Sequence, residues 1–109
     1  MDSRLISEQD LIRLQLNNLK ASKAALVPVL KLLADGCLWL ATHIRSDDDT
    51  LCGLQFIEGG FPEITTFSLS ELEMAANAPF SLVVQKDGTF TAEGRTVVDF
   101  ANDLQPHNA

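Results

Sequence analysis

The sequence has few of the residues that stabilise small secreted domains or bind metal ions. Its only cysteines are Cys37 and Cys52, and no C-x-x-C or H-x-x-x-H spacing joins them to His43 or His107 in a zinc-binding pattern. Cytosolic disulfides are rare, so two cysteines in a chain without a secretory signal predict reduced thiols. There is also no glycine-rich phosphate loop. We therefore expect no metal ion, no cofactor and no disulfide.

Long apolar segments are also absent. The longest, Ala24 to Ala34, is interrupted by Lys31 and is shorter than the roughly 20 residues that a membrane-spanning helix needs. The chain opens with Met-Asp-Ser-Arg and lacks the apolar core of a signal peptide. These features predict a cytoplasmic protein that does not bind membranes.

Basic side chains are scarce after residue 45. Residues 1–45 carry six basic and four acidic side chains, whereas residues 46–109 carry two basic and eleven acidic ones. The second part therefore has a net charge of -9, and it would be repelled by the phosphates of a nucleic acid or a membrane. Direct nucleic-acid binding is disfavoured, and a protein partner with a basic surface is favoured.

The composition is that of a globular domain. Hydrophobic residues make up 46% of the 109 residues and charged residues 21%. A chain of this length can bury one hydrophobic core without disulfides or metal ions. We predict a single domain that spans residues 1–109.

A hairpin predicted for residues 37–57 organises the rest of the chain. Residues 37–44 and 52–57 are apolar strands that flank an acidic turn, Ser46 to Thr50. A five-residue loop sets Leu40 opposite Phe56, and we prefer this register because it keeps the aliphatic side chains together. A four-residue loop instead sets His43 opposite Cys52 and Trp39 opposite Phe56.

The other elements follow from caps, turns and periodicity. Ser7 begins a helix over residues 8–20, in which Leu11, Ile12, Leu16 and Leu19 recur at helical spacing. Further strands are predicted over residues 27–33, 64–67, 80–85 and 89–91, the last two joined by a tight turn at residues 86–88. Ser68 or Ser70 caps a second helix that ends before Pro79, and Thr96 with Asp99 caps a third over residues 97–104.

Together these elements predict an α+β fold. Its antiparallel sheet has four or five strands, and three short helices pack on it.

Four motifs resemble a family of short bacterial proteins of unknown function that are carried on plasmids and other mobile elements. They are, in order, P-V-L-K-L-L, L-W-L-A-T-H-I, C-G-L and P-E-I-T-T-F-S-L-S-E-L-E. His43 stands where that family usually has an acidic residue, and Thr65-Thr66 replaces a glycine-aromatic pair. The resemblance implies a mobile-element context, in which small acidic proteins counter host restriction or CRISPR systems.

Eight residues are the candidates for contacting a partner: Asp47, Asp48, Asp49, Glu58, Phe61, Glu63, Glu71 and Glu73. The three aspartates form a turn that packing does not need, and the glutamates flank the Gly59-Gly60-Phe61-Pro62 corner. Each group also has an interpretation that needs no partner. The aspartates can form a solvated acidic face, and Glu71 and Glu73 can be carboxylates that favour the start of a helix. Phe61 can be an aromatic residue of the core. The aspartates also lack the ligand spacing and the glycine of a calcium loop.

No recognisable catalytic constellation is present. Cys52 and His43 become neighbours in the four-residue register, but no third orienting residue accompanies them. We expect a non-enzymatic, acidic protein-binding module, and the resemblance implies that it inhibits a host restriction or CRISPR-type defence complex. A dimeric structural domain and a small ligand-binding domain or enzyme are the alternatives.

Overall fold

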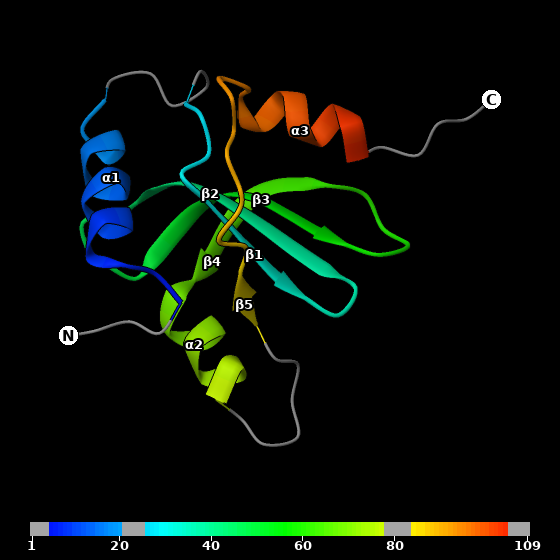
Figure 1. Cartoon of the computed structure of the whole chain (residues 1–109), viewed down its shortest axis with the longest axis horizontal. Helices are drawn as coiled ribbons and strands as arrows, with labels where there is room; N and C mark the ends of the chain where they lie inside the picture. Colours follow the sequence, from blue (N-terminus) through cyan, green and yellow to red (C-terminus); the bar gives the residue numbers. More distant parts are fainter. Residues whose placement is uncertain (1–4, 21–25, 78–83, 105–109) are drawn as a thin grey trace.

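A five-stranded antiparallel sheet with three helices packed on it forms the fold, which is α+β (Figure 1). The computed structural model describes residues 5–20, 26–77 and 84–104. The strands are ordered β4-β3-β2-β1-β5 across the sheet. In chain order the elements are α1 (Glu8–Asn18), β1 (Leu30–Ala34), β2 (Cys37–Ile44), β3 (Thr50–Ile57), β4 (Glu63–Ser68), α2 (Leu69–Asn77), β5 (Gln85–Lys86) and α3 (Val97–Leu104).

Strand β2 is apolar on both sides, and both faces of the sheet are covered by helices. Trp39 and Leu40 are consecutive in this strand, so their side chains point to opposite faces. Trp39 belongs to a core that includes Leu14 of α1 and Leu72 of α2. Leu40 belongs to a smaller core that includes Val97 of α3. Helices α1 and α2 therefore cover one face and α3 the other.

The register of the central hairpin differs from the preferred prediction. His43 pairs with Cys52, as in the four-residue alternative, but the register shifts between Ala41 and His43, so that Leu40 faces Leu54 and Leu38 faces Phe56. The predicted pairs of Leu40 or Trp39 with Phe56 are therefore both wrong. The irregularity is a bulge at Thr42, whose extra residue turns Ile44 to the same face as Trp39 and Ala41.

Polar contacts of Thr42 hold this bulge in place. Its buried Oγ1 donates a 3.0 Å hydrogen bond to the carbonyl of Cys52. The carbonyl of Thr42 in turn accepts a 2.8 Å bond from Nδ2 of Asn17, which lies in the last turn of α1. The bulge thus joins β2, β3 and α1.

Helix α1 begins where the sequence predicted and ends slightly earlier. Ser7 and Asp10 form a reciprocal capping box, with bonds of 3.1 Å to the Ser7 hydroxyl and 3.0 Å to the Asp10 carboxylate. Lys86 also pairs with this carboxylate and so joins β5 to α1. Burial raises the pKa of Asp10, but the bonds from Lys86 and Ser7 outweigh it, and the net pKa is lowered.

The hairpin predicted for the C-terminal part is not formed. Residues 80–83 lie outside the described residues, and β5 pairs with β1 instead of with residues 89–91. The carboxylate of Asp87 accepts bonds from both the amide and the hydroxyl of Thr89, which bends the chain away from the sheet. Phe90 then packs against Phe100 of α3, with the ring centroids 5.8 Å apart.

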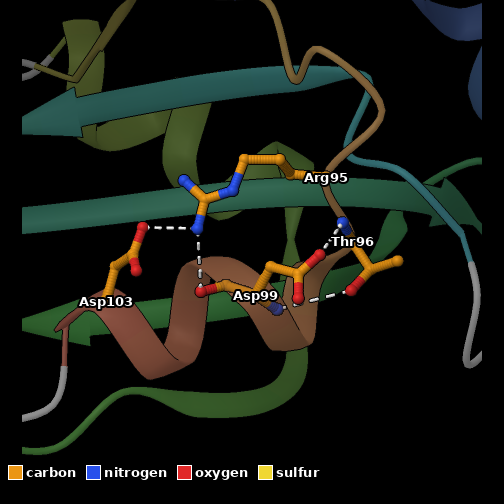
Figure 2. A network of polar contacts seen from close by, with 4 residues as sticks. All are labelled: Arg95, Thr96, Asp99 and Asp103. Carbon is orange, nitrogen blue, oxygen red and sulfur yellow. Dashed lines mark hydrogen bonds and ion pairs between the residues drawn. The ribbon is translucent and has the colours of Figure 1, made fainter.

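Helix α3 begins at the predicted capping box, which Figure 2 shows at close range. The Thr96 amide donates to the Asp99 carboxylate at 3.0 Å, and the Asp99 amide donates to the Thr96 hydroxyl at 3.3 Å. Arg95 reaches along the helix to pair with Asp103, and its guanidinium lies 4.8 Å from the centre of the Phe100 ring. These contacts account structurally for both acidic residues of this helix.

Candidate protein-binding surface

The eight candidate residues form two groups, and the elements that carry them lie at opposite ends of the β3–β4 hairpin (Figure 1). One group combines the β2–β3 turn with the start of α2 and contains Asp47, Asp48, Asp49, Glu71 and Glu73. The other combines the turn between β3 and β4 with the first residue of β4, and it contains Glu58, Phe61 and Glu63. Strand β3 has eight residues, and at about 3.3 Å per residue the two groups are roughly 25 Å apart. They are joined by β4.

The aspartates of the β2–β3 turn have structural roles that the sequence analysis did not expect. The Asp47 carboxylate accepts bonds from the Asp49 amide, the Thr50 amide and the Thr50 hydroxyl, at 2.9, 2.8 and 2.6 Å. These bonds, that of the Thr50 hydroxyl above all, lower the pKa of Asp47 to about 2. Asp48 has a left-handed backbone with φ of 54°, and it accepts a 3.0 Å bond from Gln15 of α1.

Asp49 caps the start of α2 from a distant position in the chain. Its carboxylate accepts bonds of 2.8 Å from the Ser70 amide and from the Ser68 hydroxyl, and its carbonyl accepts the Leu69 amide at 2.9 Å. The Ser70 amide bond is the main reason why the pKa of Asp49 is lowered. Ser68 Oγ also accepts the Glu71 amide, so Ser68 is the local cap of this helix. The turn is therefore a structural connection as well as an acidic surface.

Large apolar side chains project into solvent from the turn between β3 and β4 and from the strand ends beside it. We call residues 57–64 the corner. Phe61 is 72% exposed, Ile64 60% and Ile57 53%. Glu58 and Glu63 are exposed beside them. Trp39, by contrast, is buried in the core and donates a 3.1 Å bond to Gln55.

Ile57 and Ile64 are the residues of the corner that the sequence analysis missed. Both continue the apolar pattern of a strand, and that pattern alone predicts burial. Ile64 is exposed because β4 is the edge of the sheet. Strand order was not predictable from local sequence, so no signal marked this position as accessible.

The corner and the turn lie in one stretch without positive charge. Residues 46–85 contain seven carboxylates and no lysine, arginine or histidine, so their formal charge equals the -7 of the whole chain. We call this stretch the acidic segment. It includes the β2–β3 turn, β3, β4 and α2.

A second exposed apolar feature lies on α1 and on Leu19, the residue that caps its C-terminal end. Ile12, Leu16 and Leu19 were expected at the apolar helix face, but they are 49%, 56% and 80% exposed, and Leu14 is the residue of this helix that is completely buried. The three side chains line a shallow groove of about 340 Å³ with Ile44 and Arg45. Apolar residues lie on two faces of this helix, and the face that contains Leu14 is the one that packs on the sheet.

The part of the chain that the structure describes offers little for catalysis or metal binding. Cys52 lies across from His43, but the thiol is mostly buried and Nδ1 of His43 lies 2.8 Å from the Thr42 hydroxyl. Cys37 and Cys52 are free thiols at opposite ends of the hairpin. Among the described residues, no three His, Cys, Asp or Glu side chains gather to hold a metal ion. His107 lies outside these residues.

Comparison with known proteins identifies the family. No helix within the described ranges is long and apolar enough to cross a membrane. The chain has no significant match among curated proteins or solved structures. Residues 5–105 match the model of a family of proteins of unknown function, DUF2958, and the chain therefore belongs to that family.

Proposed function

We propose that this protein is a non-enzymatic acidic module that binds a basic surface of a protein partner. The observation that carries the proposal is the acidic segment, in which an exposed Phe61 stands between Glu58 and Glu63. Interfaces between proteins commonly combine an aromatic anchor with a polar rim. A charge of one sign over the surrounding surface steers a partner of opposite charge into contact.

The distribution of structural roles also supports a partner at the corner. Asp47 and Asp49 hold the β2–β3 turn and cap α2, so part of the acidity has a structural explanation. The Phe61 side chain is mostly exposed and gains little from burial within the chain. An exposed aromatic flanked by carboxylates is more simply explained by an intermolecular contact.

The resemblance to proteins of mobile elements supports one class of partner. Host restriction and CRISPR complexes hold nucleic acid in basic grooves, and an acidic surface imitates the charge of that ligand. We propose such a defence complex as the partner. The protein would act by occupying a basic groove, so it would need no catalytic residue.

Quantitative capture from a host lysate tests the proposal with matched variants. The test variant carries Glu58→Gln, Phe61→Ser and Glu63→Gln. The control carries Glu8→Gln, Leu19→Ser and Glu93→Gln, which remove the same charges and one exposed apolar side chain elsewhere. The parent and the control should retain the same basic protein at low salt, and the test variant should lose it. Equal recovery by all three would rule out the corner as the binding surface.

A further inference from the structure

The two edges of the sheet differ in how they are protected against pairing with another strand. Edge strand β5 has only two residues, one of which is Lys86. Edge strand β4 has six residues, and its pairing with β3 is regular, without a bulge. Proteins usually protect long edges with lysine, proline or bulges. Strand β4 contains none of these devices, and its only charged residue is Glu63 at one end.

Hydrogen bonding identifies which backbone groups of β4 face outward. Leu69 donates to the carbonyl of Asp49 at 2.9 Å and so continues the β3–β4 ladder by one pair. Bonded and non-bonded pairs alternate in antiparallel sheets, so Phe67, Thr65 and Glu63 bond to β3. The amides and carbonyls of Ile64 and Thr66 therefore point away from the sheet. Within the described ranges, no other backbone group bonds to them.

Charge determines what kind of strand fits this edge. Strand β4 joins the two acidic groups, with Glu58 and Glu63 at one end and Glu71 beyond the other. No basic side chain lies in residues 46–85 to offset them. A second copy of the chain would place its own acidic segment against this one, whereas a lysine- or arginine-rich segment would be attracted to the carboxylates at both ends of the strand.

We propose that β4 receives an extended basic segment of the partner protein as a sixth strand of the sheet. This inference rests on the proposed function and specifies how the partner binds. The outward amides and carbonyls of Ile64 and Thr66 bond to the backbone of the added strand. Because Glu63 and Ile64 point to opposite faces of the sheet, the segment alternates basic residues, which face Glu63, with apolar residues, which pack on Ile64.

A synthetic peptide of alternating valine and lysine is the probe for this mode of binding. Its titration into the isotope-labelled full chain is followed by amide NMR shifts. A matched peptide carries N-methyl groups on two adjacent central residues, which removes a donor from each of its edges and leaves its charge unchanged. The unmodified peptide should shift the amides of residues 63–68, and N-methylation should weaken binding at least about tenfold, through the lost backbone bonds.

Two variants of the protein distinguish strand addition from contact with side chains. Thr66→Pro removes an outward amide without removing a bond to β3, and edge positions of this kind tolerate proline. Thr66→Val keeps the amide and is the control. Thr66→Pro should weaken the peptide about tenfold, while Thr66→Val should bind within about twofold of the parent.

Four results would overturn strand addition. The first is equal binding of the two peptides, and the second is a set of shifts confined to the corner; both leave the acidic binding module in place. The third is a dimer of the parent that Thr66→Pro dissociates, which would assign the edge to a second copy. Absence of peptide binding at low salt, together with loss of partner capture in the corner variant, would overturn strand addition but would leave the proposed binding of a partner at the corner in place.

Discussion

Gly53 is the residue on which the packing of the central hairpin depends most directly. It lies opposite Ala41, beside the bulge at Thr42. A Cβ atom built at this position would lie 1.8 Å from the carbonyl oxygen of Leu40. This oxygen belongs to the backbone of a central strand, so it cannot move aside as a flexible side chain would. Glycine is therefore required here by close approach of two strands.

Replacing this glycine should destabilise the protein. Gly53→Ala forces β2 and β3 apart next to the buried Leu40 and Leu54, and overpacking of this kind costs about 1 to 3 kcal/mol. Gly88→Ala is the matched control, because a Cβ atom at Gly88 meets nothing within 4 Å. Denaturant unfolding measures both. A Gly53→Ala variant as stable as Gly88→Ala would show that the strands are not packed as closely as described.

The start of α2 shows how an element depends on a residue distant in sequence. Asp49 accepts the Ser70 amide and the Ser68 hydroxyl, and these bonds favour its ionised form and lower its pKa. A carboxyl group whose pKa is lower in the folded state stabilises the fold fully above its unfolded pKa, and this stabilisation is lost as the pH falls through the folded pKa. Acid should therefore weaken the attachment of α2 to the β2–β3 turn.

We predict that unfolding free energy declines below about pH 4, the ordinary range of an aspartate, and that Asp49→Asn reduces this decline. The variant keeps a side-chain acceptor but has no proton to gain. Denaturant unfolding at a series of pH values between 7 and 2 measures the effect. If the parent and Asp49→Asn lost stability identically on acidification, Asp49 would not act as the cap of α2 in solution.

The elements with local signals were predictable from sequence, and those set by tertiary contacts were not. The caps at Ser7 and Thr96 and the strand over Cys37–Ile44 are where the local patterns placed them. The Thr42 bulge was missed because alternation of apolar residues looks the same on either side of an extra residue. The β5–β1 pairing was missed because its partners are more than fifty residues apart in sequence.

The residue types of the candidate site were predictable from the sequence, but their arrangement in space was not. Sequence identified Phe61 and the carboxylates beside it, and the structure shows that Phe61 is exposed. The sequence alone did not predict that Asp49 would cap a helix, because the contact of Asp49 with Ser70 depends on how the strands pair. The sequence also did not predict that β4 would be the edge strand that connects the two acidic groups.

At the scale of the whole molecule, the separation of charge is the dominant feature. Residues 1–45 have a net charge of +2, and the acidic segment alone carries seven negative charges. The described basic residues Arg13, Lys20, Lys31 and Arg45 precede this segment, and Lys86 and Arg95 follow it. The protein thus presents an acidic hairpin and helix on a scaffold whose other parts are closer to neutral.

The salt dependence of association tests the binding proposal most directly. The rate constant for association with the captured partner is measured for the parent, for Glu58→Gln with Glu63→Gln, and for the control pair Glu8→Gln with Glu93→Gln. Steering by the corner predicts that only the first pair slows association, by at least about twofold at low ionic strength. At about 1 M salt, where charges are screened within about 3 Å, the three proteins should associate at the same rate. Equal rates for all three proteins at low ionic strength would contradict the account.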